Sequence, residues 1–347
     1  MPAINFYLLP LLLLLIISNR SSAVTFELPS ILGPENVGIV INDLDPMSVV
    51  VGEYYRQQRA IPTRNVFHIK LPIGPSISKA EFFGAKTTVD LRASREIQVL
   101  ALTWNAPYRV ECMSITTAFA MGFDPRFCST PCNPTMASPY FASTSRRPHD
   151  DLGIRPAMML TAKTLEDAKQ LINRGIAADG AYPFGSAYLL NTSDKARSVR
   201  IGFFSRAPQA ARGRVQVKVV NADFIEDKKE VLFYFTGAER VKKLDSLTFL
   251  DGAMADHLTS AGGQLTDSFQ MSALRWIEAG ATASYGTVAE PCAFTQKFPN
   301  PLIAMDRYLS GETLIEAYWK SVQWPGEGIF VGEPLASPFR EVERPSR

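Results

Sequence analysis

The sequence of 347 residues is poor in the side chains on which many catalytic and metal sites depend, with 4 cysteines and 3 histidines. It lacks a G-x-S-x-G elbow, a glycine-rich phosphate-binding loop and an H-E-x-x-H motif. These absences argue against a serine hydrolase of the α/β-hydrolase type, a P-loop NTPase and a zincin. The net charge is only +2, and no basic stripe interleaved with aromatic residues indicates nucleic-acid binding.

Long apolar runs are scarce as well, and the one that stands out lies at residues 6–17. It is too short for the ~20 residues that a bilayer span needs. Ser21, Ser22 and Ala23 follow it as a small-x-small cleavage site. We therefore expect residues 1–23 to be a signal peptide and the mature protein to be periplasmic or extracellular, without a membrane span. An uncleaved anchor is the alternative, because no Lys or Arg precedes the apolar run.

The four cysteines are Cys112, Cys128, Cys132 and Cys292. In an oxidising compartment an even number predicts disulfides, and three connectivities are possible. A bond between Cys128 and Cys132 would close a short loop and leave Cys112 and Cys292 to pair or to stay free. No metal or other cofactor is expected, because two cysteines do not complete a tetrahedral site and only His149 lies near them.

Short apolar runs alternate with amphipathic helices along the chain, which is typical of a mostly parallel sheet flanked by helices in three layers. We expect residues 24–347 to form a single α/β domain. Residues 105–156, rich in Pro, Ser, Thr and Cys, are predicted to form a long excursion that is either a lid or a disulfide-tied flap. The predicted strands are 37–41, 66–71, 97–103, 157–161, 187–190, 215–220, 231–235, 247–250, 281–285 and 328–332, and the predicted helices are 46–59, 78–95, 165–178, 270–279 and 312–321.

The sharpest candidate for chemistry is the pair of His257 and Cys292. Each follows a predicted core strand by a few residues, so both loops should emerge at the carboxyl edge of the sheet, where α/β proteins place ligands. A thiol needs a nearby base to act as a nucleophile at neutral pH, and histidine is the usual one. The alternative is that Cys292 belongs to a disulfide, most simply with Cys112.

The segment 251–263 is unusually polar for a strand-end loop. Asp251, Asp256, His257 and Ser260 could carry out proton transfer or hold a divalent cation. An Asx-rich turn, in which these side chains cap backbone groups, is the alternative.

Three residues after a central strand, Trp104, Tyr108 and Arg109, are a second group of candidates. An aromatic ring and a guanidinium at this position could line a binding pocket. Alternatively, the tryptophan packs beneath the following excursion.

Several segments resemble a family of exported bacterial proteins, without an established activity, that occurs in species carrying exosortase, the presumed protein-sorting transpeptidase. The resemblance implies a compartment and a genomic setting for nearly the whole mature chain. The segments that carry it are 42–48, 54–55, 59–62, 107–114, 255–263, 280–292, 297–299 and 316–321.

The sequence is also similar, more loosely, to the gingipain-like cysteine peptidases, which have a caspase-like α/β fold. His257 and Cys292 stand in the order and approximate spacing of that group's catalytic His and Cys, and 330–335 is similar to its closing Gly-Asp-Pro segment. Asp256 flanks the histidine where that group has glycine, and Glu290 lies two residues before the cysteine. The resemblance implies Cys292 as nucleophile, His257 as base, and Asp256 or Asp251 as the orienting acid.

Two functions follow for a domain of caspase-like or flavodoxin-like fold. The first is a peptidase-like Cys–His hydrolase linked to envelope protein sorting. The second is a non-catalytic binding or assembly protein of the cell envelope, with 251–263 and 105–156 as its recognition surface. Ser260 and Glu290 are predicted to contact the ligand in either case, and the expected partners are envelope or sorted proteins or peptides.

Overall fold

The computed structural model describes residues 32–128 and 132–341. The predicted signal peptide, residues 1–23, lies outside these described residues. Within them, no helix is both long and apolar enough to cross a membrane.

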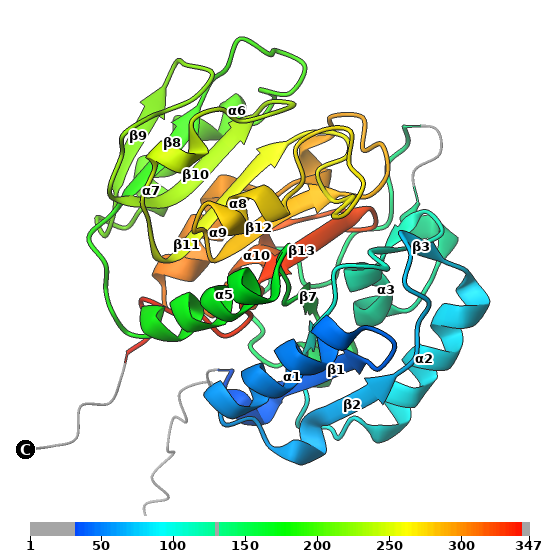
Figure 1. Cartoon of the computed structure of the whole chain (residues 1–347). Coiled ribbons are helices and arrows are strands. Elements are labelled where there is room, and N and C mark those ends of the chain that lie inside the picture. The colour runs from blue at the N-terminus through cyan, green and yellow to red at the C-terminus, as the bar shows by residue number, and fades with distance from the viewer. Residues whose placement is uncertain (1–31, 129–131, 342–347) are drawn as a thin grey trace, which may run out of the picture. The chain divides into compact units, whose positions relative to one another are not determined.

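The predicted fold class is confirmed, because the chain forms a mostly parallel sheet of ten strands with helices around it (Figure 1). β12 pairs antiparallel with β13, whereas the other eight strand pairs of this sheet are parallel. In spatial order the strands are β2 (Val66–Ile69), β1 (Val37–Asn42), β4 (Val99–Leu102), β7 (Ala157–Met159), β13 (Gly328–Gly332), β12 (Ala283–Thr287), β11 (Phe249–Leu258), β10 (Val231–Gly237), β8 (Ser186–Leu190) and β9 (Gln216–Val220).

Helices cover both faces of this sheet. In Figure 1, α1, α5 and α8 lie in front of the strands, and α9 and α10 lie behind them. α5 contacts α1, β11 and α8, and α10 contacts α9 and β13. The helices are α1 (Pro46–Gln58), α2 (Lys79–Arg92), α3 (Ile115–Met121), α4 (Pro148–Leu152), α5 (Leu165–Ala178), α6 (Ile201–Phe204), α7 (Ala207–Ala210), α8 (Leu274–Glu278), α9 (Pro301–Leu309) and α10 (Leu314–Ser321).

Helix starts follow the local sequence closely. The Asp45 side chain caps α1 by accepting from the Met47 backbone N–H at 2.9 Å, with proline in the first turn. Ser78 and Glu81 form a reciprocal capping box at the start of α2. Such caps satisfy backbone N–H groups that have no partner inside the helix, so they fix where each helix begins.

The segment 251–263 corrects the sequence prediction, because most of it is strand and not loop. β11 runs from Phe249 to Leu258, and its pairing with β10 shifts register near its start, where Gly252 has φ +86°. The apolar residues 253–255 then lie fully buried in the sheet. Asp256 and His257 are therefore core residues of a strand.

The excursion 105–156 contains buried structure of its own. Its strands β5 (Arg109–Val110) and β6 (Met113–Ser114) form a small sheet with β3 (Ser76–Ile77). α3 follows and contacts β7 and β13 of the main sheet. Residues 113–120 are buried, so this part of the excursion belongs to the core and does not act as a lid.

Candidate functional site

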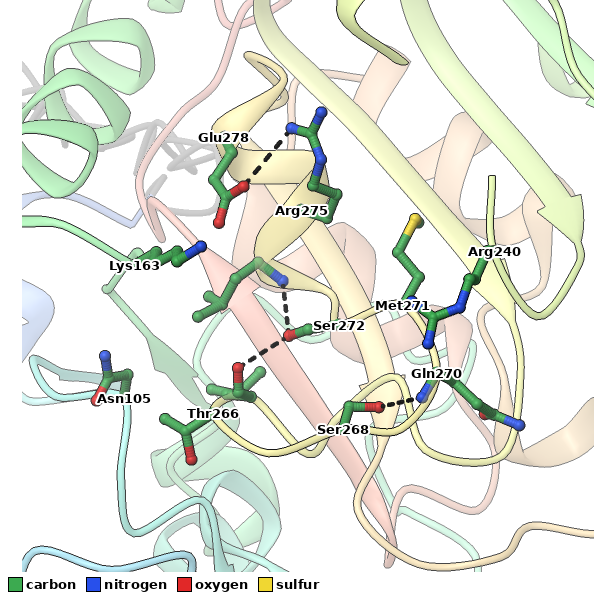
Figure 2. Close-up of a pocket in the computed structure, with 12 residues that line it drawn as sticks. Asn105, Lys163, Arg240, Thr266, Ser268, Gln270, Met271, Ser272, Arg275 and Glu278 are labelled. Atoms are coloured by element: carbon green, nitrogen blue, oxygen red, sulfur yellow. Dashed lines mark hydrogen bonds and ion pairs between the residues drawn. The ribbon is translucent and has the colours of Figure 1, made fainter. Parts of the chain in front are cut away.

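The carboxyl edge of the sheet holds a cavity of about 360 Å³ (Figure 2). Asn105 follows β4, Lys163 follows β7, Arg240 follows β10, and 265–278 follow β11. Because these residues line one cavity, the ends of four strands meet at this edge. Cavities of this size and position are common ligand sites in α/β proteins.

Cys292, the candidate nucleophile, is bonded to Cys132 in a disulfide. The second disulfide joins Cys112 to Cys128, so all four cysteines are paired. Of the three connectivities that the sequence left open, the structure has neither Cys128–Cys132 nor Cys112–Cys292. The Cα atoms of the observed pairs lie 5.7 and 5.4 Å apart, within the range that a disulfide spans. Cys292 therefore offers no free thiol.

His257, the candidate base, is fully buried on β11. Its Nε2 lies 3.0 Å from the Met271 carbonyl oxygen, and the Trp276 indole N–H donates to its Nδ1 at 3.0 Å. Burial is the main cause that lowers the pKa of His257 to about 3. The imidazole is thus neutral and has both nitrogens engaged, which leaves no atom to take a proton from a thiol.

Asp256, one of the two candidate orienting acids, contacts other partners. Its Oδ1 lies 2.6 Å from Arg200 Nη1, and its Oδ2 accepts from the Tyr318 hydroxyl at 3.1 Å. Burial raises the pKa of Asp256, an effect that Arg200 opposes. Successive side chains of a strand point to opposite faces, so Asp256 does not orient its neighbour His257.

Asp251, the other candidate acid, lies near the beginning of β11 and is exposed. Ser260, in contrast, follows the other end of the same strand, so the two residues lie at opposite ends of β11. The structure therefore does not bring Asp251, Asp256 and His257 together as a proton-transfer or cation site. Among residues 32–128 and 132–341, no group of three or more His, Cys, Asp or Glu side chains could hold a metal ion.

Three of the predicted residues do come together. Ser260, Glu290 and Cys292 line a smaller cavity of about 220 Å³ beside Thr259 and Arg197. Glu290 accepts from the Cys292 backbone N–H at 2.7 Å, and the Arg197 side chain donates to Thr259 Oγ1 at 3.3 Å. This cavity combines acid, base and hydroxyl groups with a disulfide in its wall.

The aromatic candidates after β4 are structural. Trp104 is fully buried beneath the excursion, donates to the Pro107 carbonyl at 2.9 Å, and packs edge-on against Phe119. Tyr108 donates to Asp267 Oδ1 at 2.5 Å and so joins the excursion to the segment after β11. Arg109 lies half-buried on β5. The alternative interpretation, a tryptophan packed under the excursion, matches this geometry.

Sequence reasoning missed the basic residues of the larger cavity, Lys163, Arg240 and Arg275. A signal was present, because Lys163 and Arg240 each follow a predicted strand within a few residues. Isolated Lys and Arg residues, however, occur throughout a solvated surface, so their position after a strand does not by itself indicate a cavity.

No protein-family model matches this chain, and no curated protein sequence matches it. Among solved structures, the chain is similar to the complex of Porphyromonas gingivalis RgpB pro- and mature domains, with a TM-score of 0.48 and 7% identity over 87% of this chain and 79% of that one. It is also similar to a structure described as a protease, with a TM-score of 0.44 and 11% identity over 88% of this chain and 79% of that one. Likeness at this level carries no conclusion about activity.

Proposed function

We propose that this chain is a non-catalytic binding or assembly protein of the cell envelope, and not a Cys–His hydrolase. The observation that carries the proposal is the bond between Cys292 and Cys132. A thiol hydrolase needs a thiolate and a base within reach of it. Here the sulfur is already bonded, and the imidazole of His257 is neutral and hydrogen-bonded on both sides.

The proposed ligand site is the carboxyl edge of the sheet, with the cavity of about 360 Å³ as its centre. The segment after β11 forms much of the cavity wall, and Tyr108 of the excursion holds that segment through Asp267. The proposed partners are envelope proteins or peptides. Their connection to exosortase-dependent sorting rests on the sequence resemblance alone.

The proposed location is the periplasm or the cell exterior. Two disulfides are compatible with an oxidising compartment and uncommon in a reducing one. N-terminal sequencing of the protein recovered from a cell-envelope fraction tests this, and we expect the mature chain to begin after Ala23. Recovery of the full-length chain from the cytoplasm would contradict export.

The experiment for the function combines thiol labelling with a search for hydrolysis. The native, non-reduced protein is treated with iodoacetamide and mapped by mass spectrometry, and a mixed peptide library is incubated with the wild type and with Cys292→Ala. We expect no labelled cysteine, a linked peptide that contains Cys132 and Cys292, and no cleavage that depends on Cys292.

A second arm of the same experiment adds a reductant, which would release the Cys292 thiol. Cys292 and Arg197 line the same cavity, so the released thiol would lie in a cavity that also holds a positive charge. Cleavage that appears on reduction and disappears in Cys292→Ala would establish a redox-activated hydrolase and overturn the binding proposal. His257→Ala is not a suitable test of catalysis, because the histidine is part of the core.

A further inference from the structure

The cavity of about 360 Å³ at the carboxyl edge is unbalanced in charge. Three basic side chains line it, Lys163, Arg240 and Arg275, against a single acid, Glu278. Arg275 is compensated, because its guanidinium pairs with Asp245 and lies 3.6 Å from Glu278 Oε2.

The other two cations have no such partner. Among the residues that the structure describes, no carboxylate lies within ion-pair distance of Lys163 or Arg240. Arg240 donates to the backbone carbonyl of Phe269, which satisfies one N–H and leaves the charge uncompensated. The cavity therefore presents two positive charges that a ligand can neutralise.

Two side-chain amides add hydrogen-bonding capacity. Gln270 is 5% exposed, and its Oε1 accepts from Thr259 Oγ1 and from the Ala261 N–H, each at 2.7 Å. These two bonds fix the amide and leave its N–H₂ group as a donor without a partner in the described part of the chain. Asn105 lines the same cavity, half-buried, and its amide also has no partner there. Amide groups without a partner, such as these, can pair with peptide groups.

Figure 2 shows how these groups are distributed. Lys163 and Asn105 approach from one side, whereas Arg240 and Gln270 lie on the opposite side. Met271, itself 7% exposed, lies beside Arg240, and Ser272 lies between the two groups. The arrangement suits an extended ligand that has negative charge at more than one point and amides between the charges.

We propose that this cavity binds an acidic peptide segment, with Lys163 and Arg240 pairing with Asp or Glu carboxylates and the Asn105 and Gln270 amides pairing with its backbone. The inference rests on the proposed function and names its ligand class. Charge-assisted hydrogen bonds from Lys and Arg to carboxylates are stronger than neutral ones, and charge complementarity selects among partners. Glu278 lies 3.6 Å from the Arg275 guanidinium, which weakens its repulsion of such a ligand.

The test uses fluorescein-labelled hexapeptides that alternate Ala with Glu, Gln or Lys, with fluorescence anisotropy as the measurement. The proteins are the non-reduced wild type, the double variant Lys163→Met/Arg240→Met, and the control Lys70→Met/Lys242→Met. The control removes the same charge from exposed lysines outside this cavity. Melting curves of all three proteins check that each is folded. We expect similar melting temperatures, because substitutions of exposed side chains usually change stability little.

We expect the wild type and the control to bind the Glu peptide about tenfold more tightly than the Gln peptide, with added salt reducing the difference. The Lys163→Met/Arg240→Met variant should lose this preference. Equal binding of the Glu and Gln peptides by the wild type, or a preference that survives in the double variant, would overturn the inference.

Mass spectrometry of the recovered peptides distinguishes failure of the proposed ligand class from failure of the proposed non-catalytic function. Intact peptides without an acidic preference overturn the ligand class alone. Peptides cleaved by the wild type and left intact by Cys292→Ala overturn the proposed function itself.

Discussion

The Trp276 indole N–H donates to Nδ1 of His257 at 3.0 Å, which decides the tautomer of this histidine. Nδ1 must be the acceptor, so the ring proton is on Nε2 and is donated to the Met271 carbonyl at 3.0 Å. A protonated ring would place a second donor against the indole N–H. The fully buried pair thus keeps the imidazole neutral and anchors β11 to the segment that leads into α8.

The neutral, buried imidazole of His257 predicts that the protein loses stability as the pH decreases. The unfolded chain takes up the histidine proton near pH 6.5, whereas the native pKa is about 3. Between these values the unfolded state binds more protons. The free energy of unfolding therefore falls as the pH decreases, by up to about 1.4 kcal/mol per pH unit from this group.

His257→Gln removes that group. Urea unfolding at a series of pH values should show the difference between wild type and His257→Gln shrinking as the pH falls from 6.5 toward 4. His68→Gln, at an exposed residue on β2, is the comparison variant, and at neutral pH it should lower the free energy of unfolding less than His257→Gln does. A constant difference between wild type and His257→Gln would contradict a neutral, buried imidazole.

Asp256→Asn is expected to destabilise the fold strongly, although the change is small. It leaves the Arg200 guanidinium, 2% exposed, without a charge partner, and breaking a buried ion pair from one side costs about 3–5 kcal/mol. Arg200→Met/Asp256→Leu should lose less than the sum of the two single changes. Asp251→Asn is the control, because this exposed acid should change the unfolding free energy by less than about 0.5 kcal/mol. Equal, small effects at both aspartates in urea unfolding would refute the assignment.

The sequence allowed the sheet and most helix starts to be predicted because those signals are local. Asp45, Ser78 and Thr164 cap their helices as the residue types suggest. The error at 251–263 has a physical cause. Asp256 and His257 carry polar groups that usually indicate a loop, and only distant partners make their burial possible. Tertiary hydrogen bonds of this kind leave no local pattern in a sequence.

One segment that carries the sequence resemblance, 316–321, is accounted for largely by the same kind of long-range contact. In 316–321, Tyr318 donates to Asp256, the Trp319 indole donates to the Ala157 carbonyl at 2.9 Å, and Lys320 pairs with Glu312 at 2.8 Å. The bonds of Tyr318 and Trp319 hold α10 against the sheet. A motif that is rich in Tyr, Trp and Lys thus serves the core, and sequence reasoning alone cannot separate that role from recognition.

The two disulfides should contribute unequally to stability. Cys132–Cys292 joins residues that are 160 apart in sequence, and Cys112–Cys128 joins residues 16 apart. In the chain-entropy account, closing a loop of about 15 residues is worth about 3 kcal/mol, and closing one of 100 residues about 5 kcal/mol. Cys132→Ser/Cys292→Ser should therefore lower the melting temperature more than Cys112→Ser/Cys128→Ser. The opposite order in calorimetry would show that local packing around Cys112 outweighs the loop term.

Gly286→Ala tests how the segment after β11 is held against β12. A Cβ at Gly286 would lie 2.3 Å from the carbonyl carbon of Gly262 and 2.4 Å from the backbone nitrogen of Gly263, so backbone would have to move. Overpacking of this kind costs about 1–3 kcal/mol. The shift would also displace the wall of both carboxyl-edge cavities, because Ser260 and Leu265 flank the contact on either side.

Gly202→Ala is the matched control for this substitution, since a Cβ there meets nothing within 4 Å. Gly202 lies in α6, and alanine is a better helix former than glycine. The Gly202→Ala protein should therefore be as stable as the wild type or slightly more stable. Urea unfolding of both variants decides the matter. If Gly286→Ala were as stable as Gly202→Ala, the segment 259–263 could withdraw from β12 without cost. The carboxyl-edge cavity would then not be a preformed site.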